Sequence, residues 1–324
     1  MTRSALLALV LASCGSGDSP SMLDTHAGEA RHIAGVWWLM FGIAAGVYLV
    51  VATLIFWALL RGRRRQHRTS RLNENAFIVV GGVLVPVVIL ALLAVVTVTT
   101  TKTVRTDEPG ALRIEVVGKR WWWEVRYPGT KVVTANEVHV PTGRPLDIQL
   151  DSDNVIHSFW VPQLAGKVDM IPGQHNHLRV TVDDPGTYLG ECAEFCAVGH
   201  AHMRFVVIAD PPAEFDRWMT RREQAATNPV SDAAARGQVV FQRESCAGCH
   251  TIRGTAATGV IGPDLTDFGS RKWIAAATLR NTKANLAAWI ANSQTIKPGN
   301  LMPPMSLSPG DLDAVVAYLE SLGS

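Results

Sequence analysis

The chain has 324 residues, of which 48% are hydrophobic and 18% charged, and its formal net charge is +2. A chain of this length is expected to hold more than one domain. The nearly balanced charge excludes a nucleic-acid binder that depends on a basic surface, so we expect no nucleic-acid partner. The five cysteines are too few for a small scaffold held together by disulfides.

The N-terminus has the pattern of an export signal. Arg3 precedes the apolar stretch 5–12, and residues 11–15 read Leu-Ala-Ser-Cys-Gly, which resembles a bacterial lipoprotein box. We therefore expect residues 1–13 to be a signal peptide and Cys14 to carry lipid. A chance cysteine after a signal sequence is the alternative.

Two uncharged apolar runs follow, at residues 33–60 and 76–98. Each exceeds the roughly 20 residues that cross a membrane, which predicts a transmembrane hairpin within segment 14–100. The positive-inside rule places the connecting loop in the cytoplasm and both chain ends outside. We thus expect a multi-pass protein of the bacterial inner membrane, in contact with lipid. The loop contains six arginines, Arg61, Arg63, Arg64, Arg65, Arg68 and Arg71.

Segment 101–212 has a different pattern, with short stretches in which apolar and polar residues alternate. Examples are residues 112–116, 131–133, 146–150 and 177–182, and Pro-Gly turn signals separate them. This pattern predicts a β-sandwich or barrel.

The candidate chemistry of this segment lies in residues 190–203, which hold two thiols, two imidazoles and a thioether. A blue-copper site uses one cysteine, so a second thiol favours two bridged coppers, each capped by one histidine. The second capping histidine must then come from outside this loop, and His157, which lies between strand-like segments, is the candidate. Three alternatives stay open: a Cys192–Cys196 disulfide, a mononuclear zinc site, and buried histidine and methionine with a structural role.

The pattern Cys-x3-Cys-x3-His-x2-Met, the upstream histidine and the two-span hairpin resemble subunit II of cytochrome c oxidase over about residues 30–210. The resemblance implies a cupredoxin sandwich that holds the binuclear copper centre CuA. It also implies a magnesium ion at the interface with subunit I, bound through the Glu194 side chain. His202 falls on no ligand position of the family. The implied copper ligands are Cys192 and Cys196 as bridges, His157 and His200 as terminal ligands, Met203 as a weak ligand, and the backbone carbonyl of Glu194.

Residues 118–124 read Gly-Lys-Arg-Trp-Trp-Trp-Glu and resemble the aromatic stretch that the same family has near its copper. The resemblance implies that electrons enter at Trp121. The alternative is ordinary packing of these rings against the sandwich and the membrane surface.

Residues 213–230 predict a short helix and a linker, and residues 231–324 a second soluble domain. Cys246, Cys249 and His250 form the C-x-x-C-H motif of covalent c-type haem attachment. A redox disulfide can also use a C-x-x-C pair. A helix with Ser308 as N-cap closes the chain.

This last segment resembles a small class I cytochrome c, an all-α fold. The family places its second axial ligand in a Met-Pro pair, which favours Met302 over Met305. Pro263 matches the loop that passes beside the proximal histidine, His250. All five cysteines then have a role, in lipid, copper or haem.

Together these features predict a multidomain membrane protein with a two-helix transmembrane hairpin, an all-β cupredoxin sandwich and an all-α cytochrome c domain. We expect the subunit of a proton-translocating cytochrome c oxidase through which electrons enter. They pass from its haem c through CuA to subunit I, where oxygen is reduced to water, and this chain has no oxygen-reducing site.

The expected partners are subunit I, subunit III and an external donor, cytochrome c or another periplasmic carrier. Two alternatives remain, the CuA subunit of a nitric oxide reductase and a lipid-anchored copper-binding module.

Overall fold

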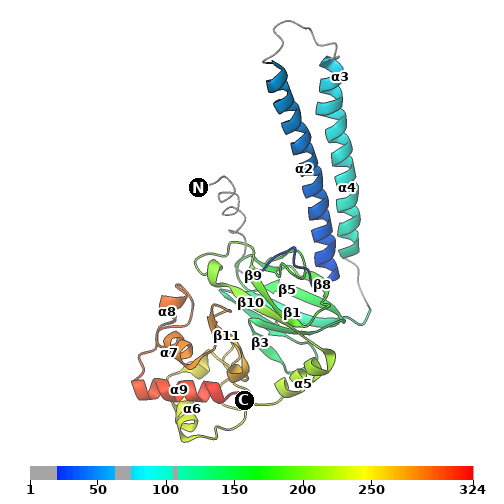
Figure 1. The fold of residues 1–324 in the computed structure, drawn as a ribbon. Helices are drawn as coiled ribbons and strands as arrows, with labels where there is room; N and C mark the ends of the chain where they lie inside the picture. Colours follow the sequence, from blue (N-terminus) through cyan, green and yellow to red (C-terminus); the bar gives the residue numbers. More distant parts are fainter. Residues whose placement is uncertain (1–19, 63–73, 105–108, 324) are drawn as a thin grey trace, which may run out of the picture.

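The computed structural model describes residues 20–62, 74–104 and 109–323. The expected signal peptide, Cys14 and most of the arginine loop lie outside these residues. Figure 1 shows two long helices that rise from a β-sandwich, with a mostly helical C-terminal domain on the side of the sandwich away from them. The predicted fold class is therefore confirmed.

The two long helices differ in their regularity. Helix α2 (Gly28–Gly62) is continuous, whereas the second consists of α3 (Glu74–Val79), the π-helical segment η1 (Val80–Leu84) and α4 (Val85–Val104). Pro86 accounts for the irregularity, because its nitrogen has no hydrogen to donate to the carbonyl of Gly82 one turn earlier. Helix α2 extends beyond the apolar run 33–60, and the second long helix, from α3 to α4, extends beyond the run 76–98.

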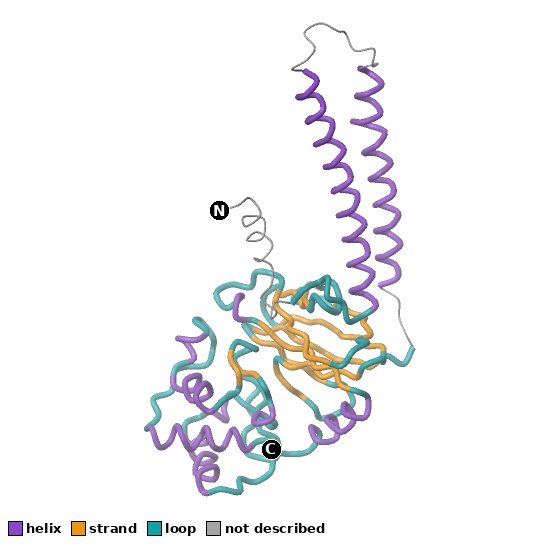
Figure 2. The backbone as a smooth tube through the Cα atoms, viewed as in Figure 1, coloured by secondary structure: helices purple, strands orange, loops and turns teal. Residues whose placement is uncertain are grey.

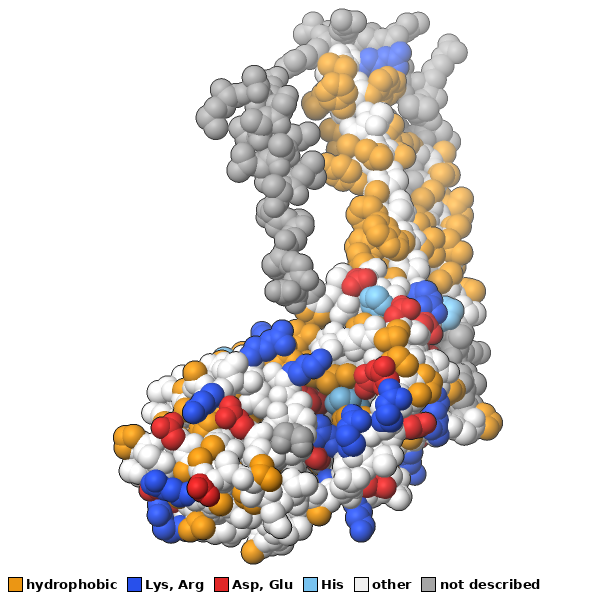
Figure 3. All heavy atoms as spheres, turned by 60° about the horizontal axis from the view of Figure 1, so that its bottom comes forward, with side chains coloured by type: hydrophobic (Ala, Val, Ile, Leu, Met, Phe, Trp, Pro, Cys, Tyr) orange, Lys and Arg blue, Asp and Glu red, His pale blue; other side chains and the backbone are white. Residues whose placement is uncertain are grey.

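The surface of this hairpin is apolar. Residues Gly28–Arg61 and Asn75–Thr101 are long and apolar enough to cross a membrane, and their most apolar stretches are not buried within the chain. Figure 3 shows apolar side chains along the two long helices, while charged side chains gather on the soluble part. Water does not support a continuous apolar surface of this extent, so the hairpin is a membrane anchor.

The strands form a sandwich of two five-stranded sheets, in the orders β3-β2-β1-β5-β8 and β4-β10-β9-β6-β7 (Figure 2). Parallel pairing of β1 with β5 and of β10 with β4 joins distant parts of the chain. The strands are β1 Leu112–Lys119, β2 Trp122–Arg126, β3 Val133–Ala135, β4 Glu137–Pro141, β5 Pro145–Ser152, β6 His157–Trp160, β7 Val168–Met170, β8 Asn176–Thr181, β9 Gly186–Cys192 and β10 Arg204–Asp210.

Aromatic rings fill the sandwich core. Trp123 lies 5.8 Å from Phe159 and 5.0 Å from Phe205, between ring centroids, and the two phenylalanines stack at 4.3 Å. The ring of His157 lies 6.0 Å from that of Trp123. This packed cluster therefore supports the end of the sandwich where His157 begins β6.

One predicted strand is misplaced. Residues 131–133 were expected to be extended, but the strand is Val133–Ala135. Lys131 and Val132 precede it in a bend, closed by a 3.2 Å hydrogen bond from the Tyr127 amide to the Val132 carbonyl. Residues 131–133 are too few for their alternation to fix a strand boundary.

The C-terminal domain is built around two helices, α6 and α9, which cross closely because Gly237 has no side chain. A Cβ there would lie 1.9 Å from the Ala314 carbonyl oxygen. Ser308 caps α9 as predicted, since its Oγ accepts from the Asp311 amide at 3.2 Å. The elements after the sandwich are α5 Pro212–Arg222, α6 Asp232–Arg243, η3 Cys246–Gly248, η4 Phe268–Ser270, β11 Trp273–Ile274, β12 Leu279–Arg280, α7 Lys283–Ala291, α8 Ser293–Ile296 and α9 Pro309–Ser321.

The C-terminal domain docks on the sandwich through polar and apolar contacts. Arg253 donates to the Lys131 carbonyl at 3.0 Å, and the Lys272 amide donates to the Glu137 carboxylate at 3.2 Å. The unpredicted β11–β12 hairpin adds an apolar contact, in which Ala277 joins a small cluster on β10. These contacts hold the two domains against each other.

Candidate metal and haem sites

Two strands and one loop bring the predicted metal ligands together. His157 begins β6 and Cys192 ends β9, and the two strands pair so that Phe159 faces Cys192. The loop after Cys192 returns Cys196, His200 and Met203 to the same end of the sandwich. All of these side chains except His200 are buried.

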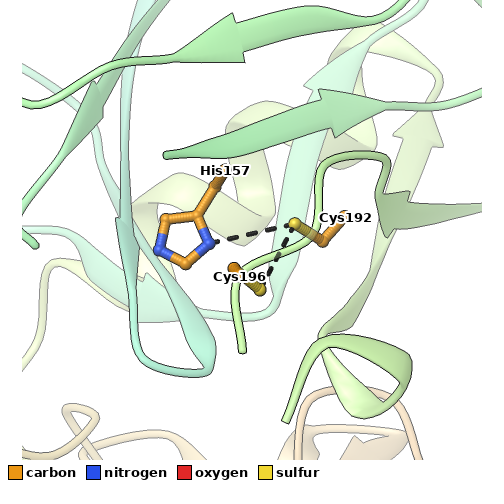
Figure 4. A group of neighbouring side chains, drawn as sticks. All are labelled: His157, Cys192 and Cys196. Atoms are coloured by element: carbon orange, nitrogen blue, oxygen red, sulfur yellow. Dashed lines mark hydrogen bonds between the residues drawn. The ribbon is translucent and has the colours of Figure 1, made fainter. Parts of the chain in front are cut away.

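The ligand atoms of His157, Cys192 and Cys196 lie within 4.8 Å of one another (Figure 4). Cys192 Sγ is 3.8 Å from His157 Nδ1 and 3.8 Å from Cys196 Sγ. The remaining members adjoin this trio: the Glu194 carbonyl is 3.2 Å from Cys192 Sγ, and Cys196 Sγ is 3.7 Å from His200 Nδ1 and 3.8 Å from Met203 Sδ.

The two thiols are free and buried. The hydrogen bond between the two sulfurs, helped by His157, lowers the pKa of Cys192 far below its usual value. The same bond and burial raise the pKa of Cys196. One thiolate therefore forms readily, and thiolate is the form of cysteine that binds metals.

The donor set fits copper. It offers two sulfurs that can become thiolates, two imidazoles and a thioether, which are soft or borderline ligands. The carboxylate of Glu194 points elsewhere, since it lies 3.7 Å from Lys167 Nζ and is 43% exposed. His202, which matches no family ligand, is half-buried outside this cluster.

Trp121 lies over the metal-binding loop. Its Nε1 donates to the Cys196 carbonyl at 2.6 Å, and its side chain is only 7% exposed. Gly199 allows the close approach, because a Cβ there would lie 2.3 Å from indole Cδ2. The indole also lines an apolar cavity that the sandwich shares with the C-terminal domain.

The C-x-x-C-H segment borders an apolar cavity of about 370 Å³, lined by the C-terminal domain and by residues of the sandwich such as Trp121 and Trp122. Cys246 and Cys249 are free and half-buried at its wall. His250 Nδ1 donates to the Pro263 carbonyl at 2.8 Å, so the predicted contact of this proline loop with the histidine is present. Burial lowers the pKa of His250, which favours the neutral imidazole that binds iron.

Two further observations test whether a haem suits this cavity. Gly262 leaves room beside the histidine, because a Cβ there would lie 2.6 Å from His250 Cε1. Arg271 also lines the cavity, and its buried Nε has no hydrogen-bond partner among the described residues. An acidic substituent of a bound group would satisfy this donor, so the residues fit a haem with its propionates.

Both candidate methionines line the haem cavity and are half-buried. The Met302 backbone is held at both ends, since its amide donates to Asn300 at 2.8 Å and its carbonyl accepts from Ser293 at 2.7 Å. The Met305 amide donates to the Ala291 carbonyl at 3.2 Å.

Sequence reasoning missed two residues that border the sites. Arg271 and Lys297 are buried at 7% and 3% exposure, and both line the haem cavity. In the sequence Arg271 stands beside Lys272 and Lys297 precedes a Pro-Gly pair, and cations in such positions are usually solvated. Their positions follow from domain docking, for which the sequence carries no local signal.

Comparison with known proteins agrees with this division. A family model described as cytochrome c oxidase subunit II, periplasmic domain, matches residues 129–210, and one described as cytochrome c matches residues 234–323. The first implies copper and the second haem.

Curated relatives extend the match to the whole chain. Cytochrome c oxidase subunit 2 of Alkalihalophilus pseudofirmus is 33% identical over 98% of this chain and 94% of the relative. That of Bacillus subtilis is 29% identical over 83% and 82%. Among solved structures, the periplasmic domain of subunit II of cytochrome oxidase of Bradyrhizobium japonicum is 29% identical, with a TM-score of 0.34 over 35% of this chain and 95% of that one. Because the Alkalihalophilus pseudofirmus relative matches along nearly the whole chain, the chain belongs to the cytochrome c oxidase subunit II family, as a membrane-anchored member with a cytochrome c domain.

Proposed function

We propose that this chain is the subunit through which electrons enter a bacterial haem–copper oxidase. In this proposal electrons pass from its own covalent haem c to a binuclear CuA centre and on to subunit I, where oxygen is reduced to water. The observation that carries the proposal is the position of Trp121, which lines the haem cavity and donates to the metal-binding loop. One side chain thus adjoins both sites.

The arrangement of the imidazoles supports a pair of coppers. His157 adjoins Cys192 and His200 adjoins Cys196, at 3.8 and 3.7 Å. A mononuclear zinc site needs four ligands around one point at roughly 2.0–2.3 Å, whereas these imidazoles lie beside different sulfurs. We assign Cys192 and Cys196 as bridges, with His157 and His200 as terminal ligands, and Met203 and the Glu194 carbonyl as weak ligands. When bound, the pair accepts and releases single electrons.

For the haem, we assign Cys246 and Cys249 to the thioether bonds, His250 to the proximal position and Met302 to the second axial position. Met305 is the competitor for that position. The haem supplies a one-electron carrier, and a methionine ligand raises its potential. The Pro263 carbonyl orients His250, because it fixes which ring nitrogen carries the proton.

Burial of Trp121 bears on where an outside donor binds. The indole is buried against the cytochrome c domain, where a Cβ at Gly299 would lie 3.6 Å from the ring. The donor therefore meets the haem domain and not the copper domain. A tethered domain stays at high effective concentration, which makes the first transfer intramolecular.

The remaining assignments concern the membrane and the partners. We place the arginine loop in the cytoplasm and both soluble domains outside, with Cys14 lipidated after removal of residues 1–13. The copper domain spans 101–212, the linker 213–230 and the haem domain 231–324. Phe195 and Val198 belong to the metal-binding loop, residues 193–203, called the copper loop below. Their side chains are 76% and 71% exposed, which suits docking to subunit I. Glu194 contributes to a magnesium site at that interface, and subunit III completes the complex.

Electron paramagnetic resonance of the oxidised full-length chain, loaded with copper and haem, tests the copper assignment. Hyperfine splitting from one electron shared over two equivalent coppers is the expected result. A single-copper pattern, or a silent sample with a Cys192–Cys196 disulfide, contradicts it.

Deletion of residues 231–324 in the assembled oxidase tests the route. Turnover with the native donor should fall sharply, while an artificial donor that reduces the copper directly should still support turnover. Unchanged turnover with the native donor refutes the proposed role of the haem domain.

A further inference from the structure

A buried lysine joins the two domains between the proposed cofactor sites. Lys297 follows α8 in the haem domain, and its side chain is 3% exposed. Its Nζ donates to the backbone carbonyl of Trp121, 176 positions earlier in the chain. The lysine also lines the haem cavity. The Lys297 side chain is therefore held where the haem domain meets the copper domain.

The environment of this lysine is unusual for a structural cation. No Asp or Glu of the described segments forms an ion pair with it, and its hydrogen bond goes to an uncharged group, the Trp121 carbonyl. Burial lowers the pKa of Lys297 to about 7, so the site disfavours the ammonium form. A buried charge without a carboxylate is costly, and an apolar side chain of similar length would fill the same space more cheaply.

The segment that begins at Lys297 contacts both sites. A Cβ at Gly299 would lie 3.5 Å from Val198 and 3.6 Å from Trp121, so this turn rests on the copper loop and on the indole. Asn300 ties the turn together, since its amide donates to the Lys297 carbonyl at 2.7 Å and its Oδ1 accepts from the Met302 amide at 2.8 Å. Three hydrogen bonds thus connect the Trp121 carbonyl to the candidate haem ligand, through Lys297 and Asn300.

We propose that Lys297 is a positioning residue for electron transfer between the two cofactors, because its hydrogen bond to Trp121 holds segment Lys297–Met302 against the tryptophan that adjoins both sites. The inference rests on the proposed function, because it presumes that copper and haem occupy their sites. The carbonyl of Trp121 accepts from Lys297, while its indole donates to the Cys196 carbonyl, so this contact fixes how the haem domain meets the metal-binding loop. Its loss should therefore slow transfer between haem and copper while both cofactors stay bound.

Two variants disturb this contact. Lys297→Met removes the hydrogen bond to Trp121 while it keeps the length of the side chain. Lys297→Gln keeps a polar group on a side chain one atom shorter, and it serves in place of the first if that variant does not fold. Lys283→Met is the matched control, since Lys283 is an exposed lysine of the same domain.

The measurements use the loaded full-length chain. Spectroelectrochemistry gives the two midpoint potentials, and flash-induced reduction of the haem gives the rate of transfer to copper. We expect both Lys297 variants to slow transfer several-fold with both midpoint potentials and both cofactor signatures retained, and Lys283→Met to match the wild type. A folded Lys297→Met or Lys297→Gln protein with the wild-type rate overturns the proposal, as does a change in either midpoint potential large enough to account for the slower rate.

The outcome is distinguishable from failure of the proposed function. In that case the wild-type chain itself lacks the two-copper resonance or the covalent haem. If only the inference about Lys297 fails, both cofactor signatures persist in wild type and variants alike.

Discussion

The indole of Trp121 donates to the carbonyl of Cys196 at 2.6 Å. The carbonyl of the same tryptophan accepts from Lys297 of the haem domain. Gly199 lies against the same ring, where a Cβ would be 2.3 Å from Cδ2. The orientation of Trp121 is therefore set jointly by the copper loop and by the haem domain.

Trp121→Phe should slow transfer from haem to copper several-fold. The change removes the hydrogen bond to Cys196 and leaves an aromatic ring of smaller size, so the contact between the two sites is weakened. Flash-induced reduction of the haem, followed at the absorption bands of both cofactors, measures the rate.

Trp122→Phe is the matched control for that experiment. Trp122 lines the same haem cavity, and the ring contact described for it is with Lys119 at 5.3 Å. A rate as low in Trp122→Phe as in Trp121→Phe would show that the hydrogen bond to Cys196 has no special role.

Cys196→Ser should abolish the two-copper resonance. A serine oxygen is a hard, poorly bridging ligand, and Cys196 adjoins Cys192, His200 and Met203. Met203→Leu removes only the weak thioether and should retain two coppers with altered splitting. Copper content and resonance spectra of the purified chains decide the matter, and a normal spectrum from Cys196→Ser would count against the bridging assignment.

Met302→Ala should remove the methionine–iron ligation of the haem, whereas Met305→Ala should leave it intact. The backbone of Met302 is held by Asn300 and Ser293, which fixes this residue at the cavity wall. The absorption band typical of methionine-ligated ferric haem reports the ligand directly. Loss of that band in Met305→Ala, with Met302→Ala unaffected, reverses the assignment.

Gly262→Ala should reduce the yield of haem-loaded protein and destabilise the haem domain by about 1–3 kcal/mol, the usual cost of overpacking. The added Cβ would lie 2.6 Å from His250 Cε1 and must displace the ring. Gly310→Ala is the control, because it lies outside the haem-attachment motif and a Cβ there would approach only the end of the Arg236 side chain, at 3.3 Å. Haem content and thermal unfolding distinguish the two variants, and equal values for both would mean that the histidine adapts at no cost.

The gathering of the metal ligands could be predicted because most of it is local. Cys192, Cys196, His200 and Met203 belong to one loop, so their spacing alone brings the side chains close. His157 is 35 positions from Cys192, yet it comes to the same place because β6 pairs with β9. A family resemblance supplied that long-range pairing, which alternation of residues does not specify.

The contacts between the domains could not be predicted in the same way. Trp121 and Lys297 meet through the docking of two folded surfaces, and neither residue has a sequence pattern that reflects it. Strands β11 and β12 have two residues each, too few for any periodicity, although their hairpin supplies an apolar contact with the sandwich. An irregular turn before Pro86 could have been predicted, because a proline inside a helix cannot donate the hydrogen bond to the carbonyl four residues earlier.

The central claim is that electrons enter this chain at its haem and pass to copper within the same molecule. Rapid reduction of the haem by a light-activated donor, at several protein concentrations, tests it most directly. The haem should become oxidised at the same rate as the copper becomes reduced, and that rate should not depend on protein concentration. A rate that rises in proportion to concentration, or copper reduced before the haem, would contradict the claim.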